Sequence, residues 1–249
     1  MKVTGIIPAR YASSRFPGKP LIDLAGKSML LRVYERCLLS TSLTEIIIAT
    51  DDQRIFDHAK TFTDKVCMTD ANHPSGTDRC AEVVELMNLD TEVVVNIQGD
   101  EPLINPKQID LLVSCFTDPQ TQIATLIKPI TNTDVLFNPN TPKVILDEHD
   151  FAIYFSRETI PHLRNIDKIN WLQHHTFYQH IGIYAYQTKV LQDITKLPQS
   201  ILEKAESLEQ LRWISNQYKI KTAITNEETI AIDSPEDVAR VLRKLGIRN

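Results

Sequence analysis

Near-continuous apolar runs alternate with amphipathic segments through the first half of the chain, and this alternation constrains the fold more than any other feature. The runs TGIIPA, TEIIIATDD and EVVVNIQGDEPLI have the character of buried strands, and the segments between them carry apolar residues at helical spacing. Strands that are apolar on both faces are typical of a parallel sheet covered by helices on both sides. The sequence therefore predicts a doubly wound, mostly parallel α/β fold.

The second half of the chain is less regular. The runs QIATLIKPI, PKVILD, FAIYFSR and HIGIYAYQT follow one another at short spacing, which is typical of antiparallel pairing. ILEKAESLEQLRWISNQY predicts one helix, and SPEDVARVLRKLG predicts a closing helix that begins after Ser234. No repeat or low-complexity linker separates the halves. We therefore expect a single α/β domain over residues 1–249, with one part over 1–130 and another over 131–249.

The charge distribution favours a small anionic ligand over a polymer. The 249 residues carry a net charge of −5, which argues against a general nucleic-acid binder. Residues 1–36 hold seven Lys or Arg against two acids, so this segment has a net charge of +5 and the rest −10. No apolar run approaches the roughly 18 residues of a membrane helix. We expect a cytoplasmic protein without membrane insertion, whose four widely spaced cysteines are buried thiols.

Three cations follow the first predicted strand, in the stretch ARYASSRFPGKPL. Arg10, Arg15 and Lys19 lie within ten residues that contain no acid. Loops that leave the carboxyl ends of parallel strands are where α/β proteins bind ligands. The stretch has neither a Walker loop nor a G-x-G-x-x-G motif, so it would hold a polyphosphate mainly by side-chain charge. A solvated basic loop is the alternative.

Carboxylates follow two other apolar runs. Asp100 ends VVVNIQGD and Asp233 ends a short run before the closing helix. Carboxylates at strand ends suit Mg²⁺, which takes one or two protein oxygens and completes its shell with phosphate and water. Either acid alone could be an ordinary turn residue. Likewise, Ser75-Gly76 ahead of Arg79 could be a nucleotide contact or only a helix cap.

Taken together, the motifs IPARYASSRFPGKPL, ATDD, SGTDR, NIQGDEP, YFSR, HIGIYAY, LEQLR and ID-x-PED resemble those of the 3-deoxy-manno-octulosonate (Kdo) cytidylyltransferases. They occur in family order from Ile7 to about Arg240. The resemblance implies a core similar to the nucleotide-diphospho-sugar transferases and transfer of CMP from CTP to the anomeric hydroxyl of Kdo, with release of pyrophosphate, for the lipopolysaccharide inner core. It also implies a cytoplasmic, Mg²⁺-dependent enzyme that is usually homodimeric. Residues 1–130 would bind CTP, and residues 131–249 would bind the sugar and form the dimer contact.

The resemblance also implies roles for individual residues. Lys19, Arg10 and Asp100 would be catalytic, and Asp100 and Asp233 would hold the metal. The nucleotide would be bound by Arg10, Arg15, Lys19, Ser75, Gly76, Arg79 and Gln98. The sugar would be bound by Gln98, Arg157, His180, Tyr184 and Glu209.

Two departures from the family pattern bear on the sugar and dimer regions. His162-Leu163-Arg164-Asn165 replaces an aromatic residue and an Arg-Asp pair, and Pro142 replaces an apolar residue. Activation of a related acid sugar such as 8-amino-Kdo is therefore an alternative. A nucleotide-binding sensor without catalysis is a third reading, against which the presence of Lys19, Asp100 and Asp233 weighs.

Overall fold

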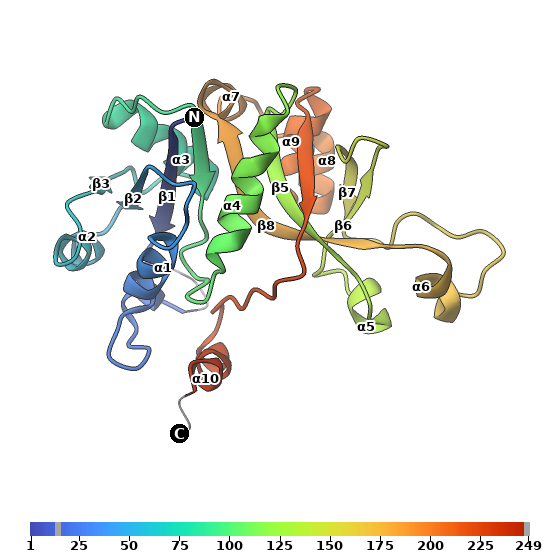
Figure 1. The fold of residues 1–249 in the computed structure, drawn as a ribbon, viewed down its shortest axis with the longest axis horizontal. Coiled ribbons are helices and arrows are strands. Elements are labelled where there is room, and N and C mark those ends of the chain that lie inside the picture. Colours follow the sequence, from blue (N-terminus) through green and yellow to red (C-terminus); the bar gives the residue numbers. More distant parts are fainter. Residues whose placement is uncertain (13–15, 247–249) are drawn as a thin grey trace. The chain divides into compact units, whose positions relative to one another are not determined.

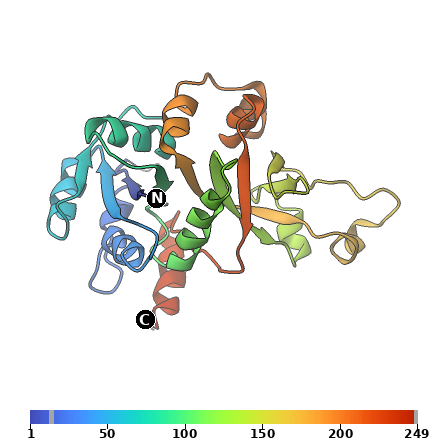
Figure 2. The ribbon, with the colours of Figure 1, turned by 45° about the horizontal axis from the view of Figure 1, so that its top comes forward.

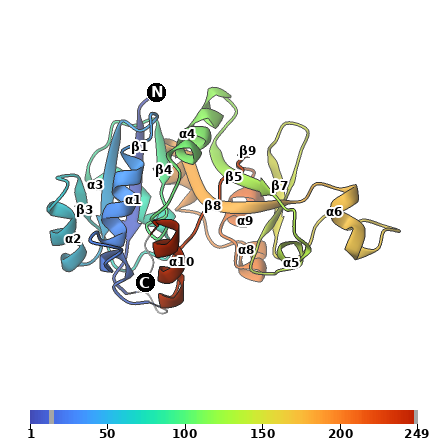
Figure 3. The same ribbon diagram turned by 60° about the horizontal axis from the view of Figure 1, so that its bottom comes forward.

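The structure is a computed structural model that describes residues 1–12 and 16–246 (Figure 1). The chain divides into two compact units, one formed by Met1–Val113 with Glu227–Asn249 and the other by Ser114–Asn226. The boundary therefore differs from the expected division at residue 130. The C-terminal segment returns to the first unit because its buried residues Ile232 and Val241 share a core with Leu24 and Met29. Figure 3 shows the C-terminal helix beside the N-terminal segments.

The first unit contains an all-parallel sheet in the order β3-β2-β1-β4. The strands are β1 (Val3–Ala9), β2 (Glu45–Thr50), β3 (Val66–Met68) and β4 (Val93–Asn96). The helices are α1 (Met29–Cys37), α2 (Gln53–Lys60), α3 (Gly76–Leu86), α4 (Pro106–Ser114) and α10 (Pro235–Lys244), with a 3-10 turn at Lys19–Leu21. The chain builds outward from β1 to β3 and then crosses to β4 on the other side of β1. The strand order therefore reverses at β1.

Local sequence signals account for these elements. Nearly every residue of β1, β2 and β4 is buried, as expected for strands between two helical layers. Helix α1 begins where Ser28 accepts a hydrogen bond from the Leu31 amide. Helix α10 begins after Ser234 with Pro235 in its first turn, as predicted. Ser234 and Asp237 also form a capping box. Within the first unit, helix α4 was not predicted from the sequence.

The second unit pairs strands in both directions (Figure 2). Strand β5 (Ile123–Pro129) pairs antiparallel with β8 (Tyr178–Gln187) and parallel with β9 (Ile220–Ile224). Strand β6 (Lys143–Leu146) pairs antiparallel with β7 (Ala152–Ser156) and with β8. The α/β fold with a mostly parallel sheet and an antiparallel second half is confirmed.

Short helices connect the strands of the second unit. They are α5 (Thr133–Leu136), α6 (Trp171–His174), α7 (Thr188–Ile194), α8 (Ile201–Glu206) and α9 (Gln210–Ser215), with 3-10 turns at Cys115–Thr117 and Lys168–Asn170. The single helix predicted for ILEKAESLEQLRWISNQY is wrong, because Ser207 adopts a left-handed conformation (φ 51°) that ends α8. All four cysteines are buried thiols, as expected. Within the described ranges, no helix has the length and apolar character needed to cross a bilayer.

Candidate active site

The reversal of strand order at β1 places a binding crevice at the carboxyl ends of β1 and β4, as in other open α/β sheets. A pocket of about 490 Å³ opens at this point in the first unit. Eight of the residues predicted for the nucleotide and the metal line it, namely Arg10, Lys19, Ser75, Gly76, Arg79, Gln98, Asp100 and Asp233. Arg15, which was also predicted to bind the nucleotide, lies outside the described residues.

Two carboxylates and a backbone carbonyl converge on the ammonium group of Lys19. Its Nζ lies 2.7 Å from Asp100 Oδ2 and 3.6 Å from Asp233 Oδ1. It also donates to the carbonyl oxygen of Ile232 at 3.1 Å. Lys19 and Asp100 are mostly covered, whereas the Asp233 side chain is 47% exposed. Oxygen atoms from the end of β4 and from the C-terminal segment thus converge on a cation from the first loop.

Backbone contacts hold these three segments together. Ile232 is fully buried, and its amide donates to the Asp100 carbonyl at 2.9 Å, which fixes Asp233 beside Asp100. Gly99 lies so close to the end of β1 that a Cβ there would stand 2.5 Å from the Pro8 carbonyl oxygen. Only glycine permits this approach. The glycine of NIQGDEP is therefore explained by the packing that sets Asp100 in the pocket.

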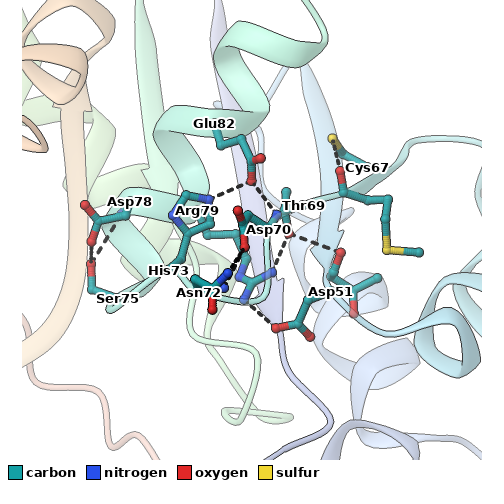
Figure 4. Close-up of polar contacts among 12 residues, drawn as sticks. Asp51, Cys67, Thr69, Asp70, Asn72, His73, Ser75, Asp78, Arg79 and Glu82 are labelled. Atoms are coloured by element: carbon teal, nitrogen blue, oxygen red, sulfur yellow. Dashed lines mark hydrogen bonds and ion pairs between the residues drawn. The ribbon is translucent and has the colours of Figure 1, made fainter.

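Arg79 reaches the pocket from α3 as a buried, charge-compensated group (Figure 4). Its side chain is 1% exposed, and its Nη2 donates to Asp51 Oδ2 at 2.8 Å. The other terminal nitrogen donates to the Thr69 hydroxyl. A buried guanidinium requires such a partner, because an uncompensated charge in the interior is costly. Asp51 was only weakly indicated by the ATDD motif, and the structure identifies it as the carboxylate that holds Arg79.

The N-terminus of α3 forms another wall of the pocket. Ser75 caps this helix, accepting from the Asp78 amide at 3.2 Å and donating to the Asp78 carboxylate at 2.6 Å. Gly76 begins the helix beside the Asn96 side chain. Ser75 is therefore a helix cap, and the capped helix end lines the pocket. The nucleotide contact at Ser75-Gly76 stays a prediction.

Glu101 is a titratable group that the sequence did not single out. It follows Asp100 directly and is 8% exposed. Burial, assisted by the negative charge of Asp100, raises the pKa of Glu101 to about 7. A low-dielectric environment therefore surrounds the end of β4, and such surroundings strengthen electrostatic interactions.

Four of the predicted sugar-site residues belong to the second unit. His180 and Tyr184 lie on β8, with ring centroids 5.2 Å apart. The His180 Nε2 is 3.0 Å from the Thr125 hydroxyl, and its ring packs edge-on against Phe155. The Tyr184 ring packs edge-on against Trp213. The two predicted residues thus form part of one aromatic cluster.

Electrostatics in this cluster favour neutral side chains. Burial lowers the pKa of His180 to about 3, so its imidazole is neutral at pH 7. Burial, together with the charge of Glu209, raises the pKa of Tyr184 well above its usual value. Glu209 precedes α9 and lies 3.6 Å from Arg212, which is also paired with Glu203. Any ligand at His180 would therefore meet a hydrogen-bonding group and not a positive charge.

Arg157 is occupied by contacts that organise the second unit. Its guanidinium donates to the carbonyl oxygens of Glu206 (2.6 Å), Pro139 (3.2 Å) and Ser207 (3.3 Å). Its amide donates to the Glu206 carboxylate, which also accepts from Ser156. These carbonyls include the C-terminal end of α8, where arginine is favoured. Arg157 therefore joins the end of β7 to the end of α8. Its role toward the sugar stays a prediction.

The two departures from the family pattern also lie in the second unit. His162 packs edge-on against Trp171, and Leu163 joins the small core around that ring. Asn165 adopts a left-handed conformation (φ 64°), which asparagine tolerates in a turn. The Pro142 carbonyl accepts from the His180 amide at 2.9 Å. Both segments therefore have identifiable structural roles.

The neutral state of His180 predicts a measurable loss of stability at acid pH. In the unfolded chain His180 binds a proton below about pH 6.5, whereas in the folded chain it remains neutral down to about pH 3. The free energy of unfolding should therefore fall by about 1.4 kcal/mol per pH unit between these values, from this group alone. Urea unfolding of the wild type and of His180→Gln, at pH 7.5, 6 and 5, measures the difference in slope. The exposed variant His174→Gln controls for the loss of a histidine as such. Parallel slopes for the wild type and His180→Gln would show that His180 takes up its proton at the same pH in the folded and unfolded chains, which contradicts the prediction.

Comparison with known proteins places the chain in a class of enzymes. The family described as cytidylyltransferase matches residues 4–221. The chain is 54% identical over 252 aligned positions to the 3-deoxy-manno-octulosonate cytidylyltransferase of Parabacteroides distasonis, with 100% of both chains covered. It is 56% identical to the protein of that name from Bacteroides thetaiotaomicron, with 96% of each chain covered. The chain is therefore a cytidylyltransferase. More narrowly, it belongs to the 3-deoxy-manno-octulosonate cytidylyltransferase family, and the resemblance noted in the sequence is confirmed.

Solved structures agree with this assignment. CMP:2-keto-3-deoxy-manno-octonic acid synthetase complexed with CTP superposes with a TM-score of 0.91 at 39% identity, covering 99% of both chains. The 4-diphosphocytidyl-2C-methyl-D-erythritol synthase of Anaerococcus prevotii superposes with a TM-score of 0.65 at 13% identity. The second likeness shows only a shared fold.

Proposed function

We propose that this protein transfers CMP from CTP to the anomeric hydroxyl of Kdo, releasing pyrophosphate, and so supplies activated sugar for the lipopolysaccharide inner core. The observation that carries the proposal is the convergence of Lys19, Asp100 and Asp233 in one pocket at the carboxyl ends of β1 and β4. Relatives that cover the whole chain bear the name of this activity.

The pocket residues fit a bound Mg²⁺. Asp100 and Asp233 present hard oxygen atoms to a common cationic group, the Lys19 ammonium. Among the residues that the structure describes, no cluster of three or more His, Cys, Asp or Glu could hold a metal. Two carboxylates alone are typical of Mg²⁺ sites that phosphate oxygens and water complete. When bound, Mg²⁺ would neutralise triphosphate charge and lower the pKa of a nearby hydroxyl.

The charge balance of the pocket supports the need for that cation. CTP carries close to four negative charges. Lys19 is offset by two carboxylates and Arg79 by Asp51, while Arg10 is exposed at the pocket. These side chains cannot neutralise a triphosphate by themselves, so CTP would enter together with divalent cation.

The roles of the chain's own side chains follow from this arrangement. Lys19 and Arg10 would donate to phosphate oxygens and stabilise the charge that develops on phosphorus and on departing pyrophosphate. The capped N-terminus of α3 at Ser75-Gly76 would offer backbone amides to the nucleotide. No separate side-chain base is required, since the sugar hydroxyl loses its proton more readily beside a cation.

Within the second unit, His180, Tyr184 and Glu209 would contact the sugar. His180 and Tyr184 are neutral hydrogen-bonding groups and Glu209 is an acceptor, so they match sugar hydroxyls better than a sugar carboxylate. Arg157 would affect sugar binding indirectly, because it holds the C-terminal end of α8 through the Glu206 carbonyl.

We also propose a homodimer located in the cytoplasm, where CTP is available. The second unit exposes large apolar side chains, among them Ile153 at 53% and Ile169 at 74%. A contact between copies of the chain would cover such side chains. Light scattering coupled to size exclusion measures the mass directly.

Pyrophosphate release tests the proposed activity. Purified protein with CTP and Mg²⁺ should release pyrophosphate when Kdo is added, and much less with no sugar or with sialic acid. An equal or higher rate with 8-amino-Kdo would assign the alternative sugar. CTP binding without release for any of these acid sugars would favour a sensor and overturn the enzymatic proposal.

A further inference from the structure

Tyr11 and Gly18 contact each other beside Arg10 and Lys19, the two described cations that are predicted to bind phosphate. The Gly18 amide donates to the Tyr11 carbonyl at 2.9 Å. Gly18 has φ 73°, and a Cβ there would lie 3.0 Å from Cζ of the Tyr11 ring. The tyrosine ring therefore rests on backbone that only glycine leaves open. Lys19 follows Gly18 directly and begins the 3-10 turn.

Arg54 of α2 covers the face of the same tyrosine ring. Its guanidinium carbon lies 3.3 Å from the ring centroid. Asp52 fixes this guanidinium, accepting from Nε at 2.9 Å and from Nη2 at 2.7 Å, and also caps α2. These hydrogen bonds lower the pKa of Asp52, so the pair stays charged at neutral pH. A planar, bidentate and stacked contact of this kind suits arginine and not lysine.

Stability alone gives little reason for this arrangement. The Arg54 side chain is 60% exposed, and exposed ion pairs contribute little to folding. Arg54 is also absent from the lining of the pocket, so it does not contact the nucleotide site directly. Its guanidinium instead covers the Tyr11 ring, which packs on Gly18. Tyr11 is one residue after Arg10, and Gly18 is one residue before Lys19. The contact thus bears on both cations.

We propose that Arg54, fixed by Asp52, is a positioning residue that holds Tyr11 against Gly18 and so preorganises Arg10 and Lys19 for the triphosphate. The inference rests on the proposed function, because it takes the ligand of this pocket to be a nucleoside triphosphate. If Tyr11 and Gly18 are already held in place, Arg10 and Lys19 lose less conformational entropy when the ligand binds. Arg54 therefore acts on nucleotide affinity and leaves sugar binding unchanged.

Calorimetric titration with CTP and Mg²⁺ tests the proposal on the full chain. Arg54→Met should weaken CTP binding about 5- to 20-fold, the effect of ordering one or two side chains on binding. The KM for CTP should rise in parallel, while kcat and the KM for Kdo stay within about twofold. Lys60→Met is the matched control, since it removes a positive charge from the same helix, and it should bind CTP like the wild type.

Two further variants separate positioning from simple charge. Arg54→Lys keeps the charge but loses the bidentate, planar contact, and should bind CTP nearly as weakly as Arg54→Met. Tyr11→Leu should weaken binding to a similar extent, and the double variant Tyr11→Leu/Arg54→Met should be little worse than either single one. Full affinity in Arg54→Lys, or additive losses in the double variant, would overturn the proposal.

The outcomes also separate this inference from the proposed function. If the wild type binds CTP but forms no product with any acid sugar, the proposed function fails while the CTP affinities still decide the role of Arg54. If the wild type is active and Arg54→Met binds CTP within twofold of it, the positioning role is refuted and the proposed function stands.

Discussion

Asp233→Asn should lower turnover by about 10²-fold or more while the protein remains folded, in the range for a lost electrostatic group. The substitution keeps the size of the side chain and one acceptor oxygen but removes the charge that a hard cation requires. Asp233 Oδ1 lies 3.6 Å from the Lys19 ammonium that Asp100 also faces, so its carboxylate belongs to the shared oxygen set. Steady-state rates across a Mg²⁺ series measure the loss, and the far-ultraviolet spectrum reports the fold.

Comparison with other variants decides between a metal ligand and a turn residue. Asp100→Asn should lose a similar factor, and the double variant should lose much less than the product, because residues that act as one unit are not additive. Glu236→Gln removes an exposed acid of α10 and should retain wild-type turnover. Normal turnover of Asp233→Asn at limiting Mg²⁺ would show that Asp233 is only a turn residue.

Lys19→Met should cost about 2–4 kcal/mol of transition-state stabilisation, measured from kcat/KM. The loss has two sources in the structure. The variant lacks a donor for the triphosphate, and it leaves Asp100 and Asp233 without the ammonium group between them. Since Lys19 lines a pocket and is not part of the apolar core, the circular dichroism spectrum should not change.

A second lysine provides the control for this prediction. Lys27 is paired with Glu35 on the surface of the same unit, so Lys27→Met removes an equal charge away from the pocket. Its kcat/KM should match the wild type. If Lys19→Met also matched the wild type, Lys19 would have no part in the reaction.

The strands of the first unit could be predicted because their signal is local. Fully apolar runs such as those at Ile47 and Val94 are buried on both faces, and polar residues mark where each strand ends. Asp100 could be predicted for the same reason, since parallel strands bring their carboxyl ends to one edge. Its proximity to Asp233 was expected from the resemblance, which assigns both residues to the metal. No local pattern encodes the return of the C-terminal segment to the first unit that produces this proximity.

Contacts between distant segments account for what the sequence did not predict. Nothing in the ATDD motif indicates that Asp51 compensates the buried charge of Arg79. Similarly, Arg54 reads as a surface residue of an amphipathic helix until its stacking on Tyr11 is seen. The break between α8 and α9 was missed because a serine in the left-handed conformation is uncommon, and glycine is the usual signal.

The most direct test of the central claim locates the divalent cation itself. Crystals grown with CTP and Mn²⁺ in place of Mg²⁺ should show, in an anomalous difference map, a peak within about 2.0–2.5 Å of carboxylate oxygens of Asp100 and Asp233, the range for a hard cation bound by oxygen. The triphosphate should then be found beside Lys19 and Arg10. Anomalous density confined to other residues, with CTP bound and both carboxylates free of metal, would contradict the account.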